Sequence, residues 1–120
     1  MVLSKDGKIS SIGDMAELPG GLRDRQEQNN EPVLDVNGAW VMPGLVDAHC
    51  HAGITEEKRG QAGDDCNEIT SPVTPYLRAI DAVDPMDPAF HDAIMAGVTS
   101  IMTGPGSSNV AGGQVAFMKV

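Results

Sequence analysis

Two histidines end the stretch Pro43-Gly44-Leu45-Val46-Asp47-Ala48-His49-Cys50-His51, which is apolar over much of its length. Side chains alternate between the two faces of a β-strand, so residues two apart point the same way. In a strand, His49 and His51 would project together, with Asp47 on the same side. Two adjacent imidazoles at a strand end can share a metal ion, although a catalytic zinc needs about three protein ligands. We therefore expect part of a metal site, and two hydrogen-bonded histidines on a polar strand face are the alternative.

The residues around and after the histidines predict a strand–helix–strand unit. Residues 45–48 lack polar alternation, which is typical of a strand covered on both faces. Asp87 and Pro88 are typical of a helix start, and Gly97 is typical of its end. The β-branched stretch 98–103 predicts a second strand. Two strands joined through a helix should be parallel neighbours with a right-handed crossover, so the chain is expected to have an α/β fold.

The first forty residues predict short antiparallel strands. Asp6-Gly7 and Asn37-Gly38 are typical of two-residue hairpin turns, because both central positions of such a turn need a positive φ. The expected strands flank these turns, at 2–4 with 8–12 and at 33–36 with 39–42. The polar residues 19–30 predict a surface loop between the two hairpins.

The connection between the two later strands, residues 52–86, is long and acidic. Loops of more than about 15 residues are uncommon in compact domains and are often functional. Its carboxylates Asp64, Asp65 and Glu68 are more typical of solvated loop charges than of acid/base groups or metal ligands. Residues 76–83 are the part of this connection in which we expect local structure.

Three further features have a plain structural interpretation. His91 lies inside the predicted helix and is expected to face solvent. Cys50 lies between the two histidines and is expected to be a small buried residue rather than a ligand. The glycine-rich stretch 104–113 lacks the Lys-Ser/Thr ending of a phosphate-binding loop. It predicts a tight loop at the sheet edge, where contact with a substrate is plausible.

The charge and composition narrow the classes of partner. The 120 residues carry a net charge of −9, and the sequence pI is about 4.5. An acidic surface repels nucleic acids and anionic membranes, so we expect neither as a partner. The apolar fraction of 41% is enough for an ordinary core. The chain has two cysteines without a CxxC pair, and its first residues do not resemble an export signal, so we expect the reducing cytoplasm.

The chain resembles the superfamily of metal-dependent amidohydrolases. Within this superfamily, it resembles the branch that contains imidazolonepropionase and related hydrolases. The residues that carry the resemblance are the stretch at 43–51, Asn67-Glu68, Ser71-Pro72-Val73-Thr74-Pro75, Asp84-Pro85-Met86-Asp87-Pro88, Ala96-Gly97-Val98-Thr99-Ser100 and Gly104-Pro105-Gly106-Ser107. The resemblance implies a (β/α)8 TIM-like barrel beside a small β-sandwich. Residues 1–42 would be part of the sandwich, and residues 43–120 would be the first two β/α units of the barrel.

The resemblance also implies a site and a reaction. His49 and His51 would bind a divalent metal, with zinc as the first expectation, and the metal would activate water to hydrolyse C–N bonds of cyclic amide or amide-like small molecules. Six residues could contact the metal ligands or the substrate: Asp47, Asn67, Glu68, Gly104, Ser107 and Asn109. No catalytic residue is expected within this chain, because the proton-carrying carboxylate of the family would lie beyond residue 120.

The expected barrel is incomplete in this chain, because a full barrel needs about 250 residues. We therefore expect the chain to be the N-terminal part of an amidohydrolase, inactive alone, that needs the rest of the barrel or self-association. Two alternatives stay open. One is a non-catalytic fragment or binding module that keeps the family sequence. The other is a metal-dependent hydrolase of another bond, such as a phosphoester.

Overall fold

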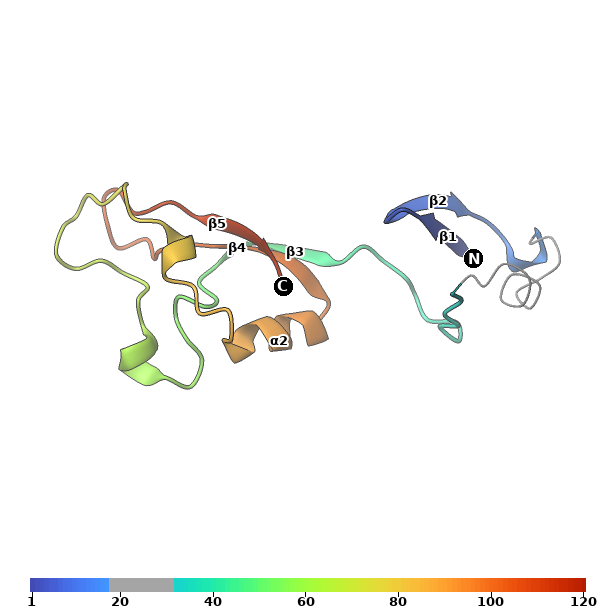
Figure 1. Cartoon of the computed structure of the whole chain (residues 1–120), viewed down its shortest axis with the longest axis horizontal. Helices are drawn as coiled ribbons and strands as arrows, with labels where there is room; N and C mark the ends of the chain where they lie inside the picture. Colours follow the sequence, from blue (N-terminus) through green and yellow to red (C-terminus); the bar gives the residue numbers. More distant parts are fainter. Residues whose placement is uncertain (18–31) are drawn as a thin grey trace. The chain divides into compact units, whose positions relative to one another are not determined.

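The computed structural model describes residues 1–17 and 32–120 (Figure 1). The chain has a mixed α/β fold and divides into two compact units, residues 1–41 and residues 42–120. The surface loop predicted at 19–30 falls outside the described residues. None of the described helices is long and apolar enough to cross a membrane.

The first predicted hairpin is confirmed. Strand β1 (Val2–Lys5) pairs antiparallel with strand β2 (Lys8–Ile12), and a short 3-10 helix, η1 (Met15–Glu17), follows. Asp6 and Gly7 join the strands with φ values of 53° and 72°, the two positive values that the turn requires.

The second predicted hairpin is wrong in its strands and right in its turn. Asn37 and Gly38 have φ values of 49° and 79°, and the Ala39 amide donates to the Val36 carbonyl at 2.9 Å. Residues 32–44 form no strand on either side of this turn. A two-stranded hairpin is marginal without an apolar surface to cover it, and Trp40 is 98% exposed. Proline at 32 and at 43 also removes a backbone donor at each end of the segment.

The second unit contains the predicted strand–helix–strand unit. Strand β3 (Leu45–Cys50) pairs parallel with strand β4 (Val98–Thr103), and helix α2 (Pro88–Met95) lies between them in the chain and packs against β4 (Figure 1). The helix boundaries also agree with the prediction. The Asp87 side chain accepts a hydrogen bond from the Ala89 amide at 2.9 Å, and Gly97 follows the helix with a φ of 86°.

A third strand, β5 (Ala116–Lys119), was not predicted from the sequence. It pairs antiparallel with β4, so the sheet order is β3-β4-β5 and β4 lies at the centre (Figure 1). Four residues are too few for a clear alternation pattern, and pairing with β4 supplies most of the order of this strand. The sheet is therefore mixed rather than purely parallel.

The long connection contains two short 3-10 helices, η2 (Gly60–Gly63) and η3 (Ala79–Asp81). The second of these confirms the local structure expected within residues 76–83. Isolated bridges join Val73 to Ala111 and Arg78 to Gln114, so the connection packs along the glycine-rich segment that follows β4.

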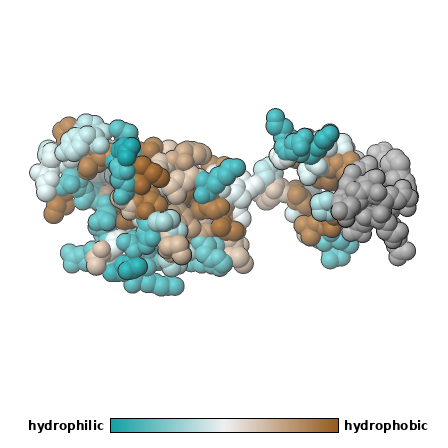
Figure 2. All heavy atoms as spheres, in the orientation of Figure 1, coloured by the Kyte–Doolittle hydropathy of each residue, from teal (hydrophilic) through white to brown (hydrophobic). Residues whose placement is uncertain are grey.

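The core of the described residues is small and lies in the second unit. Its buried apolar residues are Ile54, Cys66, Ala79 and Ile101, with Thr74, Asp87 and Thr103 as buried polar residues. The expectation that β3 is covered on both faces is wrong for this chain. Leu45 and Val46 are 48% and 58% exposed, because the described residues supply no layer over this strand. Figure 2 shows hydrophobic side chains at the surface of this unit.

Candidate metal centre

The rings of His49 and His51 lie side by side at the end of β3. Their centroids are 5.3 Å apart and their planes meet at 81°, in an edge-to-face arrangement. This proximity agrees with the alternation argument, because rings two residues apart on a strand share a face. His49 is exposed and His51 is half-buried, so both rings can be reached from outside. Cys50 between them is half-buried and carries a free thiol.

The ring of His51 has a fixed partner. Its Nδ1 atom lies 2.7 Å from the backbone carbonyl oxygen of Gly104, which directly follows β4. A carbonyl oxygen only accepts hydrogen bonds, so the proton of a neutral His51 ring must be on Nδ1. This leaves the lone pair of Nε2 for a ligand. Histidines that bind metals commonly donate their second ring N–H to a carbonyl in this way, so His51 fits the metal that the resemblance implies.

The backbone around His51 is held as firmly as the ring. The His51 carbonyl accepts from the amides of Ile54 and Thr55 at 3.0 and 2.9 Å. The next carbonyl, that of Ala52, accepts from the buried Thr103 hydroxyl at 2.8 Å. The chain therefore turns sharply after His51, and it is tied at that turn to the end of β4.

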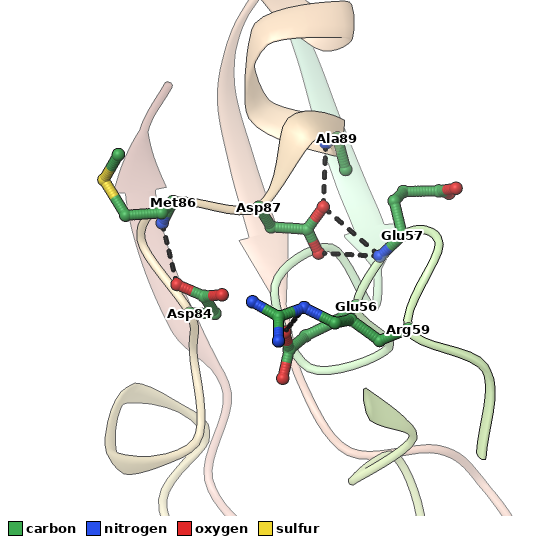
Figure 3. A network of polar contacts seen from close by, with 7 residues as sticks. All are labelled: Glu56, Glu57, Arg59, Asp84, Met86, Asp87 and Ala89. Atoms are coloured by element: carbon green, nitrogen blue, oxygen red, sulfur yellow. Dashed lines mark hydrogen bonds and ion pairs between the residues drawn. The ribbon is translucent and has the colours of Figure 1, made fainter. Parts of the chain in front are cut away.

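The buried carboxylate of Asp87 joins the loop after the histidines to the start of α2 (Figure 3). Its two oxygens accept from the Glu57 amide at 3.4 and 3.3 Å, and one of them also accepts from the Ala89 amide at 2.9 Å. Beside it, Arg59 and Glu56 form an ion pair at 3.3 Å. The sequence predicted the helix cap, but the bond to Glu57 spans 30 residues and has no local signal.

Two of the other candidate residues, Asp47 and Glu68, make contacts close to their own position. Asp47 accepts from the His49 amide at 3.0 Å, which stiffens the strand end that carries both rings. Glu68 accepts from the Thr70 amide at 2.6 Å, and hydrogen bonds from Thr70 lower the pKa of this exposed carboxyl. Ser107 is exposed in the turn after β4.

Three of the candidate residues lie at a cavity of about 380 Å³. Asn67, Glu68 and Asn109 line it, and Asn109 also donates to the Ser71 carbonyl at 3.2 Å. The Asn67 side chain packs directly on Gly106. His49 and His51 are not among the residues that line this cavity. The structure thus brings the polar loop residues together with one another, but not with the histidines.

In the part of the chain that the structure describes, the candidate metal ligands are the two histidines of this pair. There, no three His, Cys, Asp or Glu side chains lie close enough together to hold a metal ion. His91 is exposed on α2, as predicted from the sequence. The pair can supply two of the roughly three protein ligands of a catalytic zinc.

Comparisons with known proteins relate the chain to one group of enzymes. No family model matches the sequence. Amidohydrolase tasK from Hapsidospora irregularis is 37% identical over 87 residues, which are 72% of this chain and 9% of that protein. Imidazolonepropionase from Ralstonia nicotianae is 43% identical over 47 residues, or 39% of this chain and 10% of that protein.

The likeness extends to a solved structure. The crystal structure of an amidohydrolase from Thermotoga maritima MSB8 matches 98% of this chain with a TM-score of 0.81 and 41% identity. The match covers 28% of that chain. The chain thus spans about a tenth of the length of the curated relatives above and less than a third of the solved one.

Proposed function

The chain is an imidazolonepropionase-like member of the amidohydrolase superfamily, and on this premise we propose that it forms the N-terminal part of a metal-dependent amidohydrolase. The whole enzyme hydrolyses C–N bonds of cyclic amide or amide-like small molecules through a metal-activated water. The observation that carries the proposal is the pair of histidine rings at the end of β3, with the His51 ring anchored to the Gly104 carbonyl. The 120 residues are not expected to be active without the rest of the enzyme.

The proposed architecture is a TIM-like barrel whose first two strands are β3 and β4, with residues 1–42 as part of a small β-sandwich. The parallel pairing of β3 with β4 and the intervening helix α2 support this assignment. Strand β5 runs antiparallel along the edge of β4 where a third barrel strand would pair. The match to the Thermotoga maritima structure over 98% of the chain supports an amidohydrolase fold with this strand included.

His49 and His51 would hold the metal, with zinc as the first candidate. A bound zinc ion polarises a carbonyl and lowers the pKa of its water toward neutrality. Residues of this chain would orient the ligands. The Gly104 carbonyl accepts a hydrogen bond from His51 Nδ1, and the Asp47 carboxylate accepts one from the His49 amide. Further ligands and the proton-carrying carboxylate would come from other parts of the enzyme. The substrate of the enzyme would be a small molecule. The enzyme would act in the cytoplasm.

Zinc binding by the purified chain tests the metal proposal. We expect one zinc ion per chain, measured by calorimetry and by metal analysis after gel filtration. Replacing both residues, His49→Ala with His51→Ala, should abolish binding, because the two rings supply the ligands. His91→Ala is the matched control, since this histidine is exposed on α2 and away from the β3 end.

The outcome of this measurement separates the two classes of function. Zinc binding that is lost in the double variant and kept in His91→Ala supports a metal-dependent hydrolase. Zinc binding that is equal in all variants, or absent from the unaltered chain, favours a non-catalytic module. Assays of the intact enzyme against amide and phosphoester panels then distinguish the bond that is cleaved, and turnover of phosphoesters alone would refute the amidohydrolase assignment.

A further inference from the structure

Residues 103 and 104 make three hydrogen bonds to residues 50–52, one to the ring of His51 and one to the carbonyl of each of its neighbours. The Gly104 carbonyl oxygen lies 2.7 Å from His51 Nδ1, and the Gly104 amide donates to the Cys50 carbonyl at 3.2 Å. The Thr103 hydroxyl donates to the Ala52 carbonyl at 2.8 Å. These bonds reach His51 and both of its neighbours in the chain. Thr103 and Gly104 are buried, so water competes little for these bonds.

Gly104 also lies where a side chain has no room. A Cβ atom at this position would be 2.6 Å from Val115 Cγ1 and 3.3 Å from Val115 Cβ. Its φ is not in the left-handed region, so the backbone conformation is open to any residue. The need for glycine is therefore one of space: the chain leading into β5 lies directly against residue 104.

We propose that Gly104 is a positioning residue for the metal site. Because it has no side chain, the end of β4 can lie against Val115 while its carbonyl stays at His51 Nδ1. The carbonyl keeps the ring proton on Nδ1, and Nε2 is then free to bind the cation. This inference rests on the proposed function, since it explains how one proposed ligand is oriented.

Three variants of the chain test the inference: Gly104→Ala, Val115→Ala, and the two combined. In the single variant Gly104→Ala, the new methyl group conflicts with Val115. We expect residue 104 to move, which takes its carbonyl away from His51 Nδ1. Val115→Ala removes the 2.6 Å conflict and leaves the 3.3 Å approach to Cβ. We therefore expect the double variant to regain most of what the single variant loses, and Val115→Ala alone to behave like the unaltered chain.

Two readouts are needed. The first is the tautomer of the metal-free His51 ring, measured by ¹⁵N NMR at one pH where imidazole is neutral, with the exposed His91 ring as internal reference. The unaltered chain should hold the proton on Nδ1, and Gly104→Ala should give the mixture typical of a free ring. The second is the zinc dissociation constant, which should rise about tenfold or more in Gly104→Ala, as for other lost partners of ligating histidines.

Each result decides the matter. The inference is supported if Gly104→Ala loses both the Nδ1 tautomer and tight zinc binding and the double variant regains them. Recovery in the double variant supports it even if the single variant does not fold. An unchanged tautomer in Gly104→Ala overturns it, and so does a loss that Val115→Ala fails to repair. An unaltered chain that binds no zinc refutes the proposed metal site alone, because the tautomer is measured without metal and still decides the role of Gly104.

Discussion

Gly53 occupies a position where backbone conformation and packing both exclude a side chain. Its φ is 76°, and a Cβ atom there would lie 2.8 Å from Phe90 Cζ and 3.0 Å from Val83 Cγ1. Its carbonyl accepts from the Asp84 amide at 2.8 Å. This one residue therefore lets the turn after the histidines pack on α2, which ties the site to the helix.

Gly53→Ala should destabilise the chain by about 2 to 4 kcal/mol. The left-handed conformation costs about 1 to 2 kcal/mol for alanine, and overpacking against Phe90 adds a similar amount. Gly97→Ala is the matched control, because Gly97 has a φ of 86° and open space at its Cβ position. Urea unfolding of both variants measures the difference, and equal losses would show that the contact with Phe90 adds nothing.

At the scale of elements, helix α2 is joined to the loop that follows the histidines through one carboxylate. Asp87 is 3% exposed and bonds the amides of both Ala89 and Glu57. A helix cap normally serves its own first turn. Here the same side chain also serves a loop 30 residues earlier in the chain.

Asp87→Ala should cost about 2 kcal/mol or more of unfolding free energy, because the helix loses its cap and the Glu57 amide loses its acceptor. Hydrogen exchange at the Glu57 amide should also accelerate, which a lost helix cap alone would not cause. Asp84→Ala is the matched control, since the Asp84 carboxylate accepts from the nearby Met86 amide at 2.9 Å and does not reach Glu57. If Glu57 exchanges at the same rate in both variants, Asp87 acts as a cap and no more.

At the scale of the whole molecule, both edge strands of the sheet in the second unit carry exposed apolar side chains. β4 is paired on both edges, and Ile101 within it is buried. Among the described residues the exposed apolar positions of this sheet are on β3, at Leu45 and Val46, and on β5, at the 69%-exposed Phe117.

We expect the purified chain to associate through the free edge of β3, because an unpaired strand edge beside exposed apolar residues recruits other chains. Val46→Lys should shift sedimentation toward monomer, since a lysine on an edge strand opposes pairing. Ile69→Lys is the control, because Ile69 is 93% exposed in the long connection and outside the sheet. A chain that stays monomeric and melts cooperatively above about 60 °C would contradict this expectation.

Several features could be predicted from the residues alone, because their causes act within a few positions. The positive φ values at Asp6-Gly7, the cap at Asp87 and the alternation that brings His49 beside His51 are of this kind. The parallel pairing of β3 with β4 also followed, since a helix between two strands leaves few other connections. The exposure of Leu45 and Val46 on β3 could not be predicted this way, because apolar residues do not reveal whether a covering layer is present.

The sequence by itself determined the turn at Asp6-Gly7, the strand–helix–strand order and the histidine pair through local chemistry. The family followed from the resemblance of its motifs to the amidohydrolases. Only the tertiary structure decided which partners those residues meet. The His51–Gly104 contact joins positions 53 residues apart, and the Thr103–Ala52 contact joins positions 51 apart. Strand β5 likewise exists through its pairing with β4. Such contacts depend on how the chain returns to itself in space, and no short-range pattern of residues encodes that path.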